Sequence, residues 1–449
     1  IISSYPLHYC GGNYLNHQIT LSIIFLCHNN QYIDVAINAV LEQIDANDEI
    51  IIVDDHSNLS TLAVLEKYKT NSNINIISSD KIANRSYNRN LGAKHAQNPV
   101  LVFMDGDMVM GNESIVALKN GHTNRDEKAF IGQKHGIHYD ELQMKLFSSL
   151  PNYIDMISTY EGRSILEKNP LFIDSRGKYF ENPATENYRW TYYYTGLCSV
   201  EKDIFFKVGG FDENFSKWGS EDIDLGYRLS KLTKIGFLTN LHGFHIPHAR
   251  DLVSNEKSNI RNTQYMMNKY NSWEFEVKQS FYGYGDLILF EKIINQMRLL
   301  VVSEDYPKIE ENELITDVIS QRNYNGNIFY KSANGVCKVN SFFGTAIPFQ
   351  NKKFLTAYIS DHIFIYPIII TCRILQEALR VAKKVLIYPT TDSIRIDWEQ
   401  LYPITPKPPK QHFRYEANDL LCFSFSQAFN DYIEVEYIKE LKKRTLPFE

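Results

Sequence analysis

The sequence predicts an α/β protein whose core is a mostly parallel, doubly wound sheet, with a smaller α/β unit near the C-terminus. Short apolar runs alternate with helical stretches over the first hundred or so residues, and this alternation is typical of βαβ units. Two of these runs end in acidic pairs. The chain of 449 residues is too long for one ordinary hydrophobic core, so more than one domain is expected.

The elements of this sheet can be assigned in chain order after an irregular lead-in at residues 1–18. Strands are expected where short runs are rich in apolar and β-branched residues, at 20–26, 49–53, 74–77 and 100–104. The helices between these strands are expected to end near residue 41 and to cover 60–69 and 85–96.

The fourth run ends in two carboxylates separated by one glycine, Asp105-Gly106-Asp107. In open α/β sheets, ligands bind beyond the carboxyl ends of the strands. Two carboxylates there repel each other unless a cation lies beside them, and oxygen ligands suit Mg²⁺ or Mn²⁺, which phosphates commonly share. Gly106 permits a tight turn and a close approach of phosphate. The alternative is an Asp-Gly turn without chemistry.

A second acidic pair, Asp54-Asp55, follows the strand expected at 49–53. A carboxylate there can accept hydrogen bonds from a nucleotide base or a ribose, but an Asx turn is an equally good interpretation. Arg89 lies in a polar helical stretch, and its fork of donors suits a phosphate. A solvated helix face is the alternative for this arginine.

Residues 121–190 show few clear periods, and the pattern then becomes regular again. Strands are expected at 195–200 and 235–238, with a turn at 208–213. His245 and His248 follow the last of these strands. A single histidine is more often structural, but imidazole can complete the shell of a carboxylate-bound Mn²⁺, so this pair is a metal signal.

An acidic helix start lies between these two strands. Ser220 is a good N-cap for a helix that begins with Glu221 and Asp222. The helix dipole alone favours acidic residues in a first turn, so capping without chemistry is one interpretation. The Trp218-Gly219 pair just before is unusual for a cap alone. A large flat ring beside a carboxylate suits a sugar acceptor.

These motifs, in this order, resemble family 2 glycosyltransferases of the GT-A fold over about the first 275 residues. The matching segments are Phe25–Asn29, Val53–Ser57, Arg89–Gly92, the DxD motif Asp105–Asp107, Val208–Glu213, a WGxED motif at Trp218–Asp222, and His245-x-x-His248-x-Arg250. We therefore expect a lead-in at 1–18, a GT-A domain at 19–275 and a C-terminal α/β domain at 276–449.

The resemblance implies a role for each motif. The nucleotide sugar would be bound by Cys27, His28, Asn29, Asp54, Asp55, Arg89, Asp105 and Gly106, with the base, expected to be uracil, on Asp54 or Asp55. The cation, Mn²⁺ or Mg²⁺, would be bound by Asp107 with His248 or His245. The general base of an inverting transfer would be Asp222, beside Glu221, and the acceptor would contact Trp218, Gly219 and Gly196.

Two positions depart from the family pattern. His56 replaces a glycine, and Cys27 stands where a small hydroxyl residue or proline is common. Neither change removes a catalytic group. The resemblance implies a UDP-sugar donor and a glycan, lipid-linked or peptide acceptor. A glycan polymerase, a retaining transferase and a non-catalytic sugar-binding module are the alternatives.

Beyond residue 276 no family resemblance is found. Residues 364–370 are expected to form a strand, 373–384 a helix and 385–389 a second strand, which together make a small α/β unit. Residues 403–409 are proline-rich and are interpreted as a loop or spacer. A strand and a short helix are expected in the last 25 or so residues. This region could bind the acceptor, form a homo-oligomer or hold a second catalytic unit.

Composition limits the remaining classes. The net charge is −6 and no long basic run is present, which argues against nucleic acid as the main partner. The six cysteines are scattered without a CxxC pair, and no signal-peptide pattern begins the chain, so we expect a cytoplasmic location. The most apolar run is far shorter than the roughly 20 residues of a spanning helix, so membrane contact is expected only at the inner face.

Overall fold

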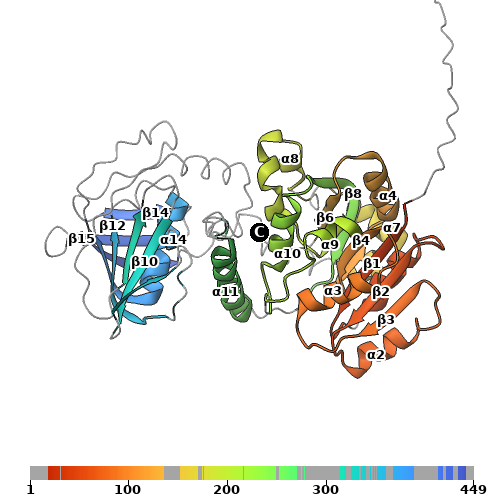
Figure 1. Cartoon of the computed structure of the whole chain (residues 1–449), viewed down its shortest axis with the longest axis horizontal. Helices are drawn as coiled ribbons and strands as arrows, with labels where there is room; N and C mark the ends of the chain where they lie inside the picture. The colour runs from red at the N-terminus through yellow and green to blue at the C-terminus, as the bar shows by residue number, and fades with distance from the viewer. Residues whose placement is uncertain are drawn as a thin grey trace, which may run out of the picture.

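The computed structural model contains two β-sheets with flanking helices (Figure 1). The lead-in, Arg250, the proline-rich stretch 403–409 and the short helix expected near the C-terminus lie outside the described residues. The structure describes residues 19–30, 32–135, 152–169, 174, 176–215, 217–248, 252–270, 275, 278, 314–319, 325–332, 335–339, 344, 347, 349, 351–360, 368–388, 413–417, 421–427 and 433–440.

The first sheet has eight strands in the order β3-β2-β1-β4-β7-β6-β8-β5. These strands are β1 (Leu21–Cys27), β2 (Glu49–Asp54), β3 (Ile74–Ser78), β4 (Val100–Asp105), β5 (Met108–Met110), β6 (Ala129–His135), β7 (Leu197–Glu201) and β8 (Ile235–His245). The pairs β1–β2, β1–β4, β2–β3 and β6–β8 are parallel, and the other three are antiparallel. The strands predicted from the sequence are thus confirmed.

Helices cover both faces of this sheet. They are α1 (Ile33–Leu41), α2 (Leu59–Glu66), α3 (Arg85–His95), α4 (Ser114–Asn124), α6 (Tyr153–Ile157), α7 (Tyr160–Glu167), α8 (Gly177–Phe180), α9 (Lys202–Lys207), α10 (Glu221–Leu229) and α11 (Leu252–Tyr270), with the 3-10 helix η2 (Pro183–Tyr192). Alternate residues of one strand enter two separate core clusters: Ile24 and Phe103 belong to one, Ile23 and Val102 to the other. The sheet is therefore doubly wound, as predicted.

Strand order brings the acidic motifs to one edge of the sheet. β1 lies between β2 and β4. The strands that follow β1 in the chain are thus added first on one side of it (β2, β3) and then on the other (β4). Open α/β sheets bind ligands at such a switch point. Cys27 pairs with Asp54, and Leu26 pairs with Asp105. Both acidic motifs therefore begin beside the last two residues of β1, at its carboxyl end.

β8 is longer than the strand expected at 235–238, because it continues to His245. Its register with β6 breaks after Gly132, which pairs with Leu238, since the next residue, Gln133, pairs with His242. Three residues of β8, at 239–241, are therefore additional. Two of them are exposed, which interrupts the apolar pattern and explains why the sequence suggested an earlier end.

β6 lies in the stretch that the sequence left unassigned. Its first residues, Ala129 to Ile131, are fully buried between β7 and β8. Its last three residues are Gln133, Lys134 and His135, which are poor strand signals. The polar end of β6 reaches the edge that carries the acidic motifs.

The second sheet has the order β11-β10-β9-β12-β13-β16-β15-β14. Its strands are β9 (Leu314–Ile319), β10 (Asn325–Ser332), β11 (Gly335–Val339), β12 (Phe354–Ser360), β13 (Ala382–Tyr388), β14 (Phe413–Ala417), β15 (Leu421–Gln427) and β16 (Ile433–Glu440). β12, helix α14 (Ile368–Val381) and β13 form a parallel strand–helix–strand unit. The predicted helix at 373–384 and strand at 385–389 correspond to α14 and β13, although 382–384 already belong to β13, but the first strand of the unit is β12 and not the segment 364–370. The expected strand at 364–370 is wrong for its last three residues, which begin α14, because a short apolar run fits a buried helix equally well.

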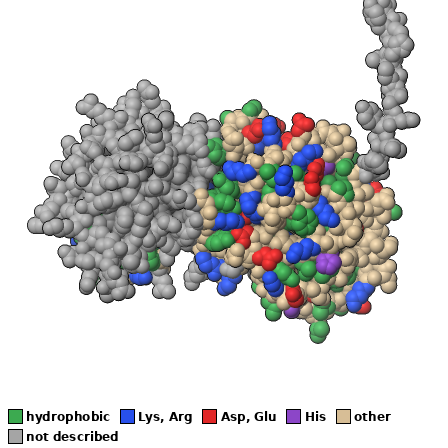
Figure 2. Space-filling view, in the orientation of Figure 1, with side chains coloured by type: hydrophobic (Ala, Val, Ile, Leu, Met, Phe, Trp, Pro, Cys, Tyr) green, Lys and Arg blue, Asp and Glu red, His purple; other side chains and the backbone are tan. Residues whose placement is uncertain are grey.

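Among the residues that the structure describes, no helix is both long enough and apolar enough to cross a bilayer. On the face drawn in Figure 2, basic and acidic side chains are interspersed over the described part of the chain.

Candidate active site

The turn after β4 is fixed by close contact with β1. The Gly106 N–H donates to the Leu26 carbonyl at 2.9 Å, and the Asn30 amide donates to the Gly106 carbonyl. A Cβ at Gly106 would lie 2.8 Å from the Leu26 oxygen. The glycine is therefore required by the neighbouring backbone, and it does not adopt a left-handed conformation. Asp105 and Asp107 consequently flank a turn that cannot move away from β1.

Asp107, His245 and His248 form a group with the donor types of a metal site. The Asp107 Oδ2 atom lies 3.0 Å from His248 Nε2 and 3.6 Å from His245 Nε2, and the three ligand atoms lie within 4.8 Å of one another. Strand pairing produces this arrangement, because Met108 of β5 pairs with His245 of β8. The Ile246 N–H also donates to the Asp107 carbonyl at 2.8 Å.

The chemistry of this group fits a divalent transition metal. Burial would raise the pKa of Asp107, but hydrogen bonds from and charges on His245 and His248 outweigh it and hold that pKa well below its usual value. The carboxylate is therefore ionised at neutral pH. One carboxylate oxygen with two imidazole nitrogens suits Mn²⁺ better than Mg²⁺, which prefers oxygen ligands.

Arg89 of α3 connects the acidic turn to α10. It is 2% exposed, and its Nη2 donates to Asp105 Oδ1 at 2.8 Å while its Nη1 donates to Glu221 Oε1 at 3.1 Å. The fork that the sequence assigned to a phosphate is thus directed at two carboxylates, and its phosphate contact stays a prediction. The other oxygen of Glu221, Oε2, is buried and has no hydrogen-bond partner within the described residues.

Asp222 follows Glu221 in the first turn of α10. Its Oδ1 atom accepts a hydrogen bond from the Ile223 N–H at 2.8 Å. Burial, and then the charge of Glu221, raise the pKa of Asp222 to about 7, whereas Arg89 and Lys134 act to lower it. A carboxylate with this pKa can exchange a proton near neutral pH, which an ordinary surface aspartate does poorly.

Lys134, at the end of β6, is a site residue that the sequence analysis missed. Its Nζ donates to the Tyr194 carbonyl at 3.1 Å, and it forms no ion pair with any residue that the structure describes. A Cβ on Gly196 would lie 2.8 Å from this Nζ and 3.5 Å from Asp105 Oδ2, so ammonium and carboxylate border the space beside Gly196. Burial, and then the charge of Arg176, lower the pKa of Lys134 to about 8.

The two carboxylates of the second acidic pair, Asp54 and Asp55, accept hydrogen bonds from different segments. Asp54 Oδ1 accepts from the Ser57 N–H at 3.2 Å, which is the Asx-type turn considered as an alternative. Both carboxylate oxygens of Asp55 accept from the Ala83 N–H, at 3.0 and 3.2 Å. His56 has a φ of 55°, a left-handed conformation that favours glycine, so the residue departing from the family pattern is held in the glycine-like geometry.

The residues after β1 differ in exposure. The Cys27 thiol lies in the core, and burial raises its pKa to about 12. Only the backbone of Cys27 is left to contact a nucleotide. His28 and Asn29 are exposed. His28 Nδ1 lies 2.6 Å from the Asp55 carbonyl, and Asn29 Oδ1 accepts from the Asn58 N–H at 2.7 Å.

The loop before α10 has an unusual backbone. Gly219 and Ser220 have φ angles of 102° and 71°. Ser220 occupies the N-cap position, but its side chain makes no capping hydrogen bond. The expected side-chain cap is therefore wrong, because the left-handed backbone directs the hydroxyl to Asn259 Oδ1 at 3.2 Å. Trp218 is half-buried in the same loop.

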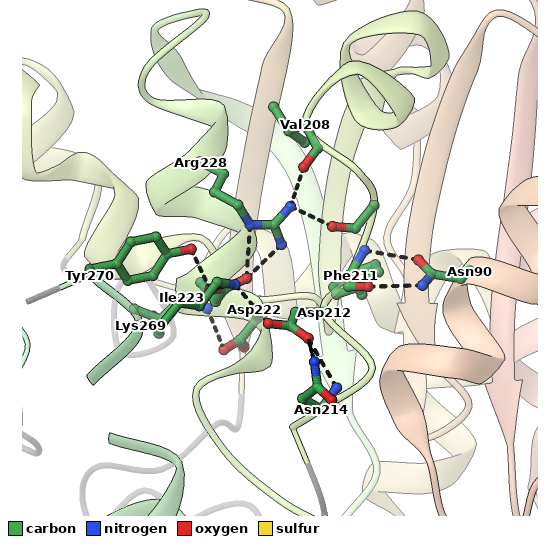
Figure 3. A network of polar contacts seen from close by, with 12 residues as sticks. Asn90, Val208, Phe211, Asp212, Asn214, Asp222, Ile223, Arg228, Lys269 and Tyr270 are labelled. Carbon is green, nitrogen blue, oxygen red and sulfur yellow. Dashed lines mark hydrogen bonds and ion pairs between the residues drawn. The ribbon is translucent and has the colours of Figure 1, made fainter. Parts of the chain in front are cut away.

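Asp224, two residues after Asp222, anchors α10. It is fully buried. Its Oδ2 accepts from Arg228 Nε at 2.9 Å, and its Oδ1 accepts from Lys269 Nζ at 2.8 Å and from the Tyr270 hydroxyl at 2.6 Å. Figure 3 shows Arg228, Lys269 and Tyr270 close to one another beside Asp222 and Ile223. The orientation of Asp222 is consequently set by α10 as a rigid unit.

Family comparison identifies the first sheet. Residues 22–206 match glycosyl transferase family 2, and residues 177–247 match the N-terminal domain of galactosyltransferase. The first match confirms the family resemblance, and the sheet with helices on both faces is the doubly wound α/β architecture that the sequence predicts. Both matches end before α11 begins.

Among known proteins, the chain is 26% identical to validoxylamine A glucosyltransferase of Streptomyces hygroscopicus subsp. limoneus over 267 residues, which is 57% of this chain and 58% of that protein. It is also 26% identical to chondroitin synthase of Pasteurella multocida (strain Pm70) over 226 residues, 48% of this chain and 23% of that protein. The chain thus spans less than two thirds of the length of these relatives.

Among solved structures, one that the chain is similar to is S. aureus TarS 1–349 in complex with UDP-GlcNAc. Its TM-score is 0.41 at 14% sequence identity, and the likeness covers 58% of this chain and 66% of that one.

Proposed function

We propose, on the premise that residues 22–206 contain a glycosyl transferase family 2 domain, that this chain transfers a sugar from a UDP-sugar to an acceptor hydroxyl with inversion at the anomeric carbon. One observation supports this most. The metal-type group at Asp107 and the acidic start of α10 are joined through the turn at Gly106 and the contacts from Asp105 through Arg89 to Glu221.

A divalent cation, Mn²⁺ in preference to Mg²⁺, would be held by Asp107, His245 and His248 and would neutralise charge that grows on the leaving diphosphate. The rigid turn at Gly106 keeps the Asp107 carboxylate beside the two imidazoles. Asp105, fixed by Arg89, faces the same edge of the sheet and is available to ribose hydroxyls. Asp54 and Asp55 are both kept as candidates for binding the base, because one oxygen of Asp54 is used in its own turn and both oxygens of Asp55 accept from the Ala83 N–H.

Asp222 acts as the general base. It takes the proton of the acceptor hydroxyl while that oxygen forms its bond to the sugar C1 and the bond from C1 to the diphosphate oxygen breaks. Its pKa of about 7 makes it a stronger base than an ordinary aspartate and still leaves it ionised at slightly alkaline pH. Arg89 and Lys134 favour its ionised form. Trp218 and Gly219, just before α10, would form part of the acceptor site.

The test is UDP release from a panel of UDP-sugars in the presence of Mn²⁺, Mg²⁺ or EDTA. We expect release from one class of donor, with Mn²⁺ the more effective ion, and an inverted anomer in the product by NMR. A retained anomer would support the retaining alternative, and long products would support a polymerase. Binding of UDP-sugars without any release would instead indicate a sugar-binding module.

Several finer assignments stay predictions. They are the acceptor class, the domain limits 19–275 and 276–449, the cytoplasmic location at the inner face of the membrane, and a homo-oligomer formed through the C-terminal region.

A further inference from the structure

The backbone before the proposed base is held in an unfavourable conformation. Lys217 and Ser220 have φ angles of 61° and 71°, and Gly219 lies between them at 102°. A left-handed conformation is unfavourable for L-residues other than glycine. Such strain persists only where the surrounding structure enforces it, and it clusters at functional sites. Something outside the loop must therefore hold it.

α11 supplies these contacts from the middle of the helix. Ser258 Oγ accepts from the Trp218 N–H at 3.0 Å and donates to the Trp218 carbonyl at 2.7 Å. Asn262 Nδ2 donates to the Trp218 carbonyl at 3.2 Å and to the Gly219 carbonyl at 2.7 Å. Both α11 side chains are buried, so these bonds are shielded from competing water.

Asn259, the residue after Ser258, contacts the same loop at Gly219 and Ser220. Its Oδ1 accepts from the Ser220 hydroxyl at 3.2 Å. A Cβ on Gly219 would lie only 2.9 Å from this oxygen. The glycine of the WGxED motif is therefore required both by its positive φ and by the packing of α11 against it.

The C-terminal half of α11 holds the chain on the other side of Asp222. Lys269 Nζ donates to Asp212 at 2.7 Å and to Asp224 at 2.8 Å, and the Tyr270 hydroxyl donates to Asp224 at 2.6 Å. Asp222 thus lies between two segments that the same helix fixes. This helix lies wholly beyond residue 247, where the second family match ends.

We propose that Ser258, Asn259 and Asn262, here called the α11 clamp, are positioning residues that hold the strained loop 217–220 and thereby aim Asp222 at the acceptor hydroxyl. The inference rests on the proposed function for its catalytic consequence. Its structural part, that the clamp maintains the loop, stands independently of any activity.

The first test is hydrogen exchange of the amides of residues 217–224 in Asn262→Ala. Removal of two buried hydrogen bonds should speed their exchange roughly tenfold or more, while exchange in β1 and β4 stays unchanged. Asn38→Ala is the matched control. Asn38 is an asparagine of α1, and its side chain accepts a hydrogen bond from the Tyr68 hydroxyl, not from the loop 217–220. Unchanged exchange at 217–224 in a folded Asn262→Ala would overturn the proposal, whatever the activity of the protein.

The second test separates positioning from folding. With the UDP-sugar that the donor panel identifies, kcat for UDP release should fall at least tenfold in Asn262→Ala, with the affinity for UDP and Mn²⁺ within twofold by calorimetry. Ser258→Ala, a milder change, serves if Asn262→Ala loses its native circular dichroism. Loss of nucleotide affinity together with kcat, or an unchanged kcat in both variants, would refute the positioning role. A wild-type chain without UDP release would contradict the proposed function and leave the exchange result to decide on the clamp.

Discussion

The metal-type group and the proposed base are built in different ways, although Arg89 and the turn at Gly106 connect them. Asp107 and His245 are brought together by backbone pairing of β5 with β8. Asp222 depends on a left-handed loop and on side chains from a helix that lies far along the chain. The proposed nucleotide and metal site thus rests on the sheet, whereas the aim of the proposed base rests on helix packing, so the two should be separable by mutation.

The largest effect should come from Asp222→Asn, which keeps the shape of the side chain but removes the proton acceptor. General-base catalysis contributes about 10²–10⁴-fold, so kcat for transfer should fall by that factor. Affinity for UDP with Mn²⁺, measured by calorimetry, should stay within twofold, because Asp222 lies outside the metal group. Asp126→Asn, an exposed change of the same kind, is the control. Transfer at a near-normal rate would remove Asp222 from the role of base.

Asp107→Ala should act on the other side of the comparison. Loss of a direct ligand should weaken Mn²⁺ binding by more than about 100-fold, since even residues behind the ligands are typically worth 10–100-fold. Mn²⁺ titration in the presence of UDP, by calorimetry or electron paramagnetic resonance, measures this. His248→Ala should follow the same direction. An unchanged Mn²⁺ affinity would show that the ion binds elsewhere.

The pH dependence of kcat should report on the proposed base separately from the proposed metal site. The pKa of Asp222 is raised to about 7, and the base must be ionised, so kcat at saturating donor and Mn²⁺ should rise through pH 7 and level off above it. Lys134→Met removes a positive charge that lowers this pKa, so the rise should move to higher pH, with a several-fold loss of kcat below pH 7. Lys134→Arg, which keeps the charge, is the control. A profile that does not move would disconnect Lys134 from Asp222.

The smallest effect is expected for Gly196→Ala. The added Cβ would lie 2.8 Å from Lys134 Nζ, but that atom ends a flexible side chain and can move aside. We expect kcat to change by less than about threefold, within the modest cost of a small overpacking, with UDP and Mn²⁺ binding unaltered. A loss as large as that of Asp222→Asn would show that Gly196 itself contacts a substrate.

Much of the sheet and of its acidic edge could be predicted, because strand alternation and the carboxyl ends of parallel strands follow from local pattern and topology. Asp105, Asp107 and the two histidines were found in this way. The buried thiol of Cys27 was also predictable, since it continues the inward alternation of Leu21, Ile23 and Phe25, but the family resemblance directed attention to its place in a motif.

Lys134 and the α11 clamp were not predictable, because their importance arises from tertiary contacts. Lys134 follows apolar residues in a stretch without a clear period, and only the pairing of β6 with β8 brings it to the site. Asn259 and Asn262 look like ordinary polar residues of a surface helix until the helix is packed against the loop. The start of α14 was misassigned because an apolar run of three or four residues has no period of its own.

The three additional residues of β8 have a consequence for related chains. Side chains of a strand alternate between faces, so an odd number of extra residues reverses the parity of everything that follows. Lys134 pairs with Gly243, and His245, two residues later, therefore lies on the same face. A homologue that lost a single residue at 239–241 would keep a foldable sheet but present its imidazole to the opposite side. The length of this small insertion, more than its composition, thus sets the face of the sheet on which the residue at position 245 lies.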